Sequence, residues 1–270
     1  MDKAQKAKNL IELQKALSPE RREFLSRFLE RKWFKNTDFV LQKELLTLPF
    51  DWDGFLSDLV KRKDEIGGMD VLKLSDFKRG EFLGLIRFKV RVKSTNEVIN
   101  YGEYVNYKFG NNPGYRGIIL LEQNSQITHF MIKKSEKFPI GEAVFESFGG
   151  TVQYKYGQLI NMPKNVELEI KRQLGINELE IKRFIDLGQI YTDVGRASHH
   201  ISLFAAIIDV TNNNKNISTL KDKEISKTKR ISFELKIEPI EKLHEYIHKV
   251  DDSFFLGVVL RLVSQGILQI

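Results

Sequence analysis

A group of charged and amide side chains on one expected helix carries the clearest chemistry in this sequence. Residues 163–175 favour a helix, with a proline near the start and a glycine at the end. Glu169, Arg172 and Gln173 are spaced by three and four, so they share one helical face. We expect Glu169 to pair with Arg172, whose guanidinium suits phosphate oxygens and repels Mg2+. This face therefore favours an anionic ligand and no metal, although a solvated helix residue is the alternative interpretation of Arg172.

The composition excludes several other kinds of chemistry. The 270 residues contain no cysteine, which excludes disulfides, thiolate zinc sites, iron–sulfur clusters and cysteine catalysis. No P-loop, G-x-G-x-x-G or G-x-S-x-G motif is present. No apolar run reaches the roughly 18 residues of a membrane span, so we expect a cytoplasmic protein. The net charge of +7 permits an acidic partner such as a phosphate, a nucleotide or nucleic acid.

The elements around this helix predict an α+β or α/β/α sandwich fold. Residues 1–76 are predicted to be a helical N-terminal extension, with helices starting near Pro19, Asp38 and Asp53, and residues 77–270 a second domain. Alternating apolar residues, with a turn at Asn124-Ser125, predict strands at 82–92, 97–109, 116–122, 126–133, 143–148, 181–191, 200–210 and 231–237. After a polar loop at 211–230, two helices close the chain at 239–250 and 252–265, the second capped by Asp252.

The stretch 145–176 resembles the signature of the Nudix family, G-x5-E-x7-R-E-U-x-E-E-x-G-U, where U is aliphatic. Glu146-Ser147-Phe148-Gly149-Gly150 is similar to the E-L-P-A/G-G segment of ADP-ribose pyrophosphatase-type members. Segments 190–195 and 202–206 resemble their downstream loop and strand. The resemblance covers about residues 97–265 and implies a Nudix-like α/β/α sandwich with a mixed sheet.

The box of this sequence departs from that signature in its acidic positions. Aligning Gly175 with the signature glycine puts Leu168 at the arginine, Glu169 at the following glutamate, and Arg172 and Gln173 at the paired glutamates. The resemblance therefore implies recognition of a nucleoside-diphosphate ligand, ADP-ribose or a nucleotide sugar, with little or no metal-dependent hydrolysis. The ligand-binding residues that it implies are Gly149, Gly150, Arg172, Gln173, Asp193, Arg196 and His200.

Two enzymatic interpretations remain open. An active Nudix diphosphate hydrolase would take Mg2+ through Glu146, Glu167 and Glu169 in an altered geometry, with Glu169 and Glu146 as catalytic residues. The second interpretation is a nucleotide-sugar dehydratase. Thr128-His129-Phe130 and residues 145–153 resemble the H-F-L … P-T-V-Q core of NDP-hexose 2,3-dehydratases, which are themselves Nudix-like in fold.

Two further features have alternative interpretations. His199 and His200 are adjacent on an expected strand, so only one of them can face a pocket, and solvent exposure is the alternative. Residues 1–35 contain ten basic and five acidic side chains. This basic segment could bind nucleic acid, but its apolar residues favour an accessory cap or an element that forms a homodimer.

Overall fold

The structure is a computed structural model of the chain. It describes residues 12, 15, 19–110, 114–137, 139, 141–151, 154–155, 158–159, 162–174, 181–193, 197, 199–211 and 233–269. The chain divides into two compact units. The first unit comprises Met1–Pro113, Tyr154–Gln158 and Tyr191–His199, and the second comprises Gly114–Gln153, Leu159–Ile190 and His200–Ile270.

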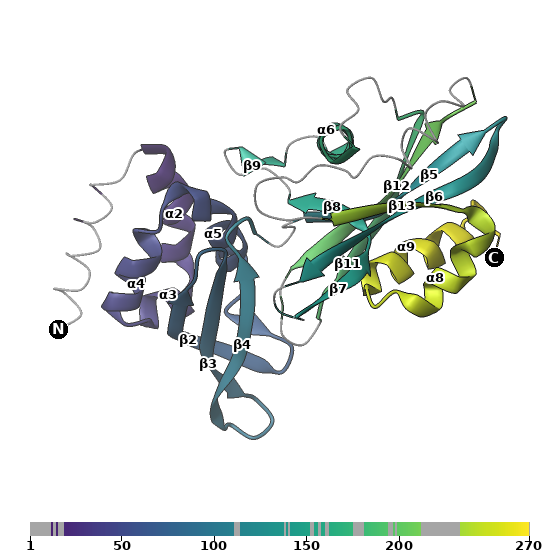
Figure 1. The fold of residues 1–270 in the computed structure, drawn as a ribbon. Coiled ribbons are helices and arrows are strands. Elements are labelled where there is room, and N and C mark those ends of the chain that lie inside the picture. The colour runs from purple at the N-terminus through teal and green to yellow at the C-terminus, as the bar shows by residue number, and fades with distance from the viewer. Residues whose placement is uncertain are drawn as a thin grey trace. The chain divides into compact units, whose positions relative to one another are not determined.

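The first unit packs helices against one face of an antiparallel sheet (Figure 1). Its helices are α2 (Pro19–Glu30), α3 (Lys32–Asn36), α4 (Phe39–Leu46), η1 (Phe50–Trp52) and α5 (Asp53–Val60). Its sheet has the order β1 (Glu65–Ile66), β2 (Met69–Arg79), β3 (Leu83–Val92) and β4 (Val98–Tyr107). The helix starts predicted at Pro19 and near Asp38 and Asp53 agree with these bounds.

Aromatic side chains fill the space between these helices and the sheet. Trp33 of α3 meets Phe88 of β3 edge-on, with ring centroids 5.2 Å apart. The ring centroids of Phe55 in α5 and Phe77 in β2 are 5.4 Å apart. Each such buried side chain contributes about 1.5–3 kcal/mol through removal of apolar surface from water. This shared core makes the helices and the sheet one folding unit.

The helical segment predicted for residues 1–76 ends earlier than expected. Residues from Met69 onward form β2, and the compact unit that contains the helices continues to Pro113. The buried residues of β2 are Val71, Leu74 and Phe77, which are three apart instead of two because the strand has two register shifts. A spacing of three is typical of a helix, so the bulges conceal the strand in the sequence.

The second unit is built on a seven-stranded mixed sheet. The main order is β11 (Arg183–Tyr191), β12 (His200–Asp209), β5 (Gly114–Gln123), β6 (Gln126–Lys137) and β13 (Phe233–Pro239). β7 (Glu142–Glu146) pairs with β6, and β8 (Phe148–Thr151) pairs with β5. β12 and β5 are parallel, whereas β6 is antiparallel to β5 and β13. The short strands β9 (Tyr154–Lys155) and β10 (Gln158–Leu159) pair with each other.

Helices cover both faces of this mixed sheet (Figure 1). The helices are α6 (Met162–Leu174), η2 (Ile240–Lys242), α8 (Leu243–Lys249) and α9 (Ser253–Ser264). Ile118 and Leu120 of β5 enter the core shared with α8 and α9. Tyr115 is an odd number of residues from Ile118, so its side chain projects to the other face of the sheet. There its hydroxyl donates to the Asn165 carbonyl of α6 at 3.4 Å. The arrangement is an α+β fold with a mixed sheet, which confirms the predicted fold class. None of the described helices is long and apolar enough to cross a membrane.

The predicted turn at Asn124-Ser125 is confirmed. Both residues have positive φ, 50° and 63°, and they join β5 to β6 with Gln123 opposite Gln126. Two consecutive residues with positive φ are the backbone of a tight hairpin turn whose twist matches that of the strands.

The predicted cap at Asp252 is also confirmed, and this side chain has a second role. Its Oδ1 accepts from the backbone N–H of Phe254 at 2.9 Å, which caps α9. Its Oδ2 accepts from Ser147 twice, from the backbone N–H at 2.7 Å and from the hydroxyl at 2.5 Å. One carboxylate therefore fixes the start of α9 and the link between β7 and β8.

Replacing Asp252 with alanine should lower the free energy of unfolding by about 1–3 kcal/mol, because the cap and the bonds to Ser147 are lost together. Asp251→Ala is the matched control, since this neighbour is exposed, and it should change stability by less than about 0.5 kcal/mol. Urea unfolding followed by far-UV circular dichroism measures both. Equal midpoints for the two variants would contradict the double role.

Candidate functional site

Helix α6 presents the residues on which the sequence analysis rests. Val166 and Ile170, one turn apart, are buried and hold the helix in place. Leu168 lies away from that face and is 56% exposed. The predicted helix at 163–175 is thus confirmed to within one residue at each end, and its polar positions fall beside the sheet face that bears Tyr115.

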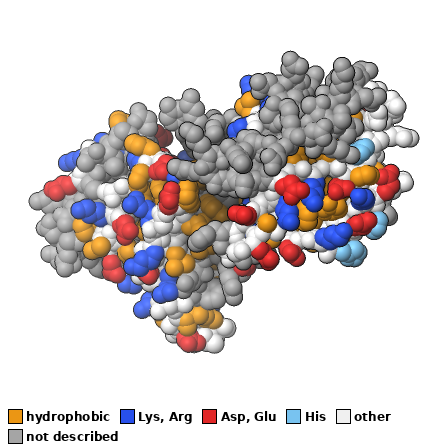
Figure 2. Space-filling view, in the orientation of Figure 1, with side chains coloured by type: hydrophobic (Ala, Val, Ile, Leu, Met, Phe, Trp, Pro, Cys, Tyr) orange, Lys and Arg blue, Asp and Glu red, His pale blue; other side chains and the backbone are white. Residues whose placement is uncertain are grey.

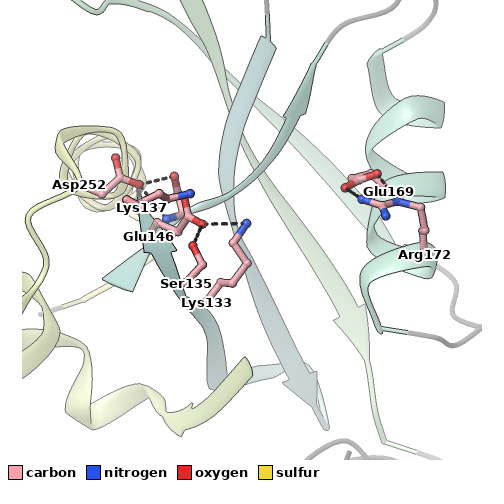
Figure 3. A network of polar contacts seen from close by, with 8 residues as sticks. Lys133, Ser135, Lys137, Glu146, Glu169, Arg172 and Asp252 are labelled. Carbon is pink, nitrogen blue, oxygen red and sulfur yellow. Dashed lines mark hydrogen bonds and ion pairs between the residues drawn. The ribbon is translucent and has the colours of Figure 1, made fainter. Parts of the chain in front are cut away.

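Glu169 and Arg172 form the pair expected from their spacing (Figure 3). The Arg172 Nε donates to Glu169 Oε2 at 2.9 Å, and Nη2 donates to Oε1 at 2.5 Å. The Arg172 side chain is 58% exposed and that of Glu169 is 22% exposed. The fork uses both carboxylate oxygens and leaves Arg172 Nη1 outside these two bonds. The side chain of Gln173 lies outside the described residues.

Tyr115 is a polar group near this pair that the sequence analysis missed. Burial, followed by the negative charge of Glu169, raises the pKa of its phenol to about 12. The phenol therefore keeps its proton at neutral pH and acts as a hydrogen-bond donor. Its position after Gly114 in a strand gave no sign of this role, which depends on the approach of α6.

Gly149 and Gly150 are required by packing between β8 and β5. They pair with Arg116 and Tyr115 respectively. A Cβ at Gly149 would lie 2.4 Å from the Tyr115 carbonyl oxygen and 2.6 Å from Arg116 Cδ. A Cβ at Gly150 would lie 2.6 Å from the Tyr115 hydroxyl. The glycines thus make room for two side chains of β5, and a role in ligand binding stays a prediction.

Glu146 lies in a buried ionic cluster on β6 and β7. Its carboxylate contacts Lys133 Nζ at 3.0 Å and Lys137 Nζ at 2.7 Å, and it accepts from the Ser135 hydroxyl (Figure 3). Burial alone would raise the pKa of Glu146, but the Lys133 charge and the hydrogen bonds from Lys137, Ser135 and Lys133 lower it. Burial lowers the pKa of Lys133, against the raising effect of Glu146. The cluster therefore holds Glu146 ionised among cations.

The three carboxylates that could hold Mg2+ all have cationic partners. Glu146 pairs with two lysines, Glu169 with Arg172, and Glu167 with Lys171 at 2.6 Å. Within the part of the chain that the structure describes, no group of three His, Cys, Asp or Glu side chains is placed to hold a metal ion. Figure 3 draws Glu146 and Glu169 in two separate groups of contacts. This donor set does not fit the oxygen-rich shell that Mg2+ requires.

The remaining predicted ligand residues lie in other segments. Asp193 is exposed, and its backbone carbonyl accepts from Ala197 N–H at 3.0 Å. Arg196 lies outside the described residues. His200 begins β12 and is half-buried, whereas its neighbour His199 is buried. The role predicted for His200 stays a prediction.

His199 is buried and contacts neighbouring side chains of the first unit. Its Nε2 lies 2.9 Å from the Thr192 hydroxyl, and its ring meets Tyr107 edge-on with centroids 4.6 Å apart. The sequence analysis placed both histidines on a strand, but β12 begins at His200 and His199 precedes it. The burial of His199 could not be predicted from the sequence, because it depends on contacts with residues of other segments.

Comparisons with known proteins give a limited result. No model of a known protein family matches the chain, and no curated protein matches it in sequence. Among solved structures, the chain is similar to one described as "Crystal structure of ADP compounds hydrolase". The TM-score is 0.49 at 10% identity, with 76% of this chain and 99% of that chain covered.

Gly149→Ala should destabilise the second unit by about 1–3 kcal/mol, because the new Cβ meets the Tyr115 backbone oxygen, which cannot rotate away. Gly257→Ala is the control. Gly257 lies within α9, and its Cβ would meet only the side chains of Ile190 and Leu203 at 3.5 Å, which is an ordinary contact distance. That variant should gain up to about 1 kcal/mol of helix propensity. Chemical denaturation of both variants measures the difference, and a Gly149→Ala protein as stable as the wild type would contradict the packing account.

Glu146→Gln should lower stability at neutral pH by about 3–5 kcal/mol, because two largely buried lysines lose their counter-charge. In the wild type, the lowered pKa of Glu146 means that its contribution is present above the ordinary value of 4.5 and is lost as the pH falls through the lower folded-state value. At high pH the variant should recover, because the lowered pKa of Lys133 lets this group lose its charge below 10.5.

The control for this prediction is Glu142→Gln, which removes an exposed carboxylate from the same strand. Unfolding measured from acidic to alkaline pH should show a difference from wild type that is largest near neutral pH for Glu146→Gln alone. A difference that does not vary with pH would mean that shape, and not charge, makes Glu146 important.

Proposed function

We propose that the second unit is a Nudix-like domain that recognises a nucleoside-diphosphate ligand, ADP-ribose or a nucleotide sugar, with little or no metal-dependent hydrolysis. The observation that carries this proposal is the forked pair between Arg172 and Glu169. In the alignment with the Nudix signature, Arg172 takes the position of a glutamate. It donates to both carboxylate oxygens of Glu169, the acidic residue that is kept.

The charges on this helix suit a phosphate better than a metal. A divalent cation would have to take Glu169 from Arg172 and then tolerate the guanidinium beside it, which Coulomb repulsion disfavours. A phosphate would instead find Arg172 already oriented by the fork, with Nη1 outside the bonds to Glu169. Arginine N–H groups bind phosphate oxygens through strong, charge-assisted bonds.

Tyr115 supports the same proposal from the sheet side. Its phenol is protonated at neutral pH, since its ordinary pKa of 10.0 is well above 7 and burial raises it to about 12, and the hydroxyl lies at the α6 face of the sheet. A neutral donor near Arg172 adds to the binding of an anion and offers no ligand for a cation. The 3.4 Å bond to Asn165 is long, so exchanging it for a phosphate oxygen costs little.

The active hydrolase remains the alternative function, with Glu169 and Glu146 as catalytic residues and Mg2+ as cofactor. It requires that Arg172 and the two lysines of β6 release these carboxylates when metal binds. The dehydratase interpretation rests on sequence resemblance around His129, and no contact in the described residues favours it over the binding function.

ADP-ribose should raise the melting temperature in buffer that contains EDTA, because the protein supplies the positive charge itself. Arg172→Ala should weaken this binding by about tenfold, the loss expected for one charge-assisted hydrogen bond. Lys249→Ala is the matched control. Lys249 forms a similar ion pair within α8, with its Nζ 3.1 Å from Glu245 Oε2. Helix α8 covers the face of the sheet opposite to α6, so this variant removes a cation away from the proposed site. Thermal shift and titration calorimetry measure both variants.

Product analysis separates this proposal from the hydrolase. Incubation of ADP-ribose with the protein and Mg2+ or Mn2+ should release no AMP or sugar phosphate. Metal-dependent turnover that is lost in Glu169→Gln would overturn the proposal and establish the alternative.

A further inference from the structure

Helix α8 has two histidines on its exposed face, one turn apart. His244 and His248 are the first and last residues of an H-E-x-x-H sequence, and both are exposed. Side chains four residues apart on a helix share one face, with about 5–6 Å between their Cβ atoms. Figure 2 shows histidine side chains at the surface of the second unit, over the region where Figure 1 places α8. Two imidazoles at this spacing can reach the same small ligand.

The ring of His244 is oriented by the backbone. Its Nδ1 lies 2.7 Å from the carbonyl oxygen of Glu241. A carbonyl oxygen only accepts hydrogen bonds, so Nδ1 carries the proton of the neutral ring and Nε2 keeps its lone pair. Histidines that bind metal ions are typically held in this way, with the second ring nitrogen bonded to a carbonyl or a carboxylate. Nε2 of His244 is therefore available as a ligand atom at an exposed position.

The helix that carries both histidines is anchored on the sheet. Leu243 and Tyr246 on its other face are buried, and so is Val250 directly after it. The Tyr246 ring meets Phe130 of β6 edge-on, with centroids 5.3 Å apart, and its hydroxyl donates to Glu238 Oε1 at 2.9 Å. Because these contacts fix the backbone, only the side-chain torsion angles of the two histidines need to adjust when a ligand binds.

The charges around the histidines do not oppose a cation. Lys249 Nζ lies 3.1 Å from Glu245 Oε2, and Lys242 Nζ lies 3.2 Å from Glu238 Oε2. Each of these lysines thus has a carboxylate partner on the same segment, and Glu241 adds a further negative charge. A cation bound by the histidines would therefore meet no net repulsion from residues 238–249.

The number of ligands limits the chemistry of this helix. Hydrolytic zinc sites have three protein ligands and a bound water, and in H-E-x-x-H enzymes the glutamate acts as the general base. Here Glu245 bonds to Lys249, and the described residues contain no group of three His, Cys, Asp or Glu side chains that could hold a metal ion. The described residues therefore supply two ligands and leave the remaining positions to water, an arrangement that favours binding over hydrolysis.

We propose that His244 and His248 form a binding site for a divalent transition-metal ion such as Zn2+. Imidazole nitrogens suit Zn2+, Ni2+ and Cu2+, whereas Mg2+ and Ca2+ prefer oxygen ligands. The site lies on the helical layer opposite to α6, so it is independent of the proposed function. A bound ion would link successive turns of α8 and stabilise the folded protein by mass action.

Zinc binding to the whole chain is measured by titration calorimetry and thermal shift, with Zn2+ alone as the probe after metals have been removed with EDTA. The wild type should bind Zn2+ and melt at a higher temperature in its presence. His248→Ala should weaken this binding by at least about tenfold, since even residues that only orient a metal ligand contribute about that much. Because His248 is exposed, the variant without metal should unfold at the same urea concentration as the wild type.

The matched control is the double variant His248→Ala, Lys249→His. It keeps the number of histidines and moves the second one to a position five residues from His244. Residues five apart lie on different faces of a helix, so the double variant should bind Zn2+ as weakly as His248→Ala.

Wild-type protein that binds no Zn2+ would overturn this inference. Equal affinities of the wild type and His248→Ala would also overturn it, because the ion would then bind elsewhere. Full binding by the double variant would do the same, since the spacing of the histidines would then not matter. None of these results depends on ADP-ribose, whose binding tests the proposed function separately.

Discussion

The ionisation of Glu146 in a buried place is the constraint on which much of the second unit depends. A buried carboxylate needs cations, so β7 must pair with β6 in the register that puts Glu146 opposite Lys133. The next residue, Ser147, is bonded to Asp252, which also caps α9. The end of β7 is therefore held by the ion pairs of Glu146 and by the hydrogen bonds of Ser147 to Asp252 at the start of α9. These contacts determine where β8 begins.

Close packing between β8 and β5 extends this constraint to α6. β8 approaches β5 closely enough that Gly149 and Gly150 have no room for a side chain, and Arg116 and Tyr115 occupy the space instead. Tyr115 contacts α6 through Asn165, and the charge of Glu169 influences its pKa. The polar groups on this side of the sheet are thus linked through backbone geometry, although they come from different elements.

Local features of this protein could be predicted from its sequence, and features set by strand register could not. The Glu169–Arg172 pair, the turn at Asn124-Ser125 and the cap at Asp252 each depend on residues within four positions of one another. The Glu146–Lys133 pair depends on how two strands align, and β2 was concealed by its bulges. Tyr115 gained its role only through the approach of a helix that lies fifty residues later. The helix and its ion pair were therefore predicted from the sequence, whereas the contacts on the sheet were not, and the ligand-binding roles stay predictions.

Under the proposed function, recognition of a diphosphate does not require the glutamates of the signature. In a metal-dependent site, one glutamate with its Mg2+ carries a net charge of one positive unit. The Arg172–Glu169 pair is neutral as a whole, so it would offer a phosphate an oriented N–H donor instead of a net charge. It would not activate water, because a guanidinium stays protonated and cannot lower the pKa of a bound water as a metal does. This single exchange would therefore separate binding from hydrolysis.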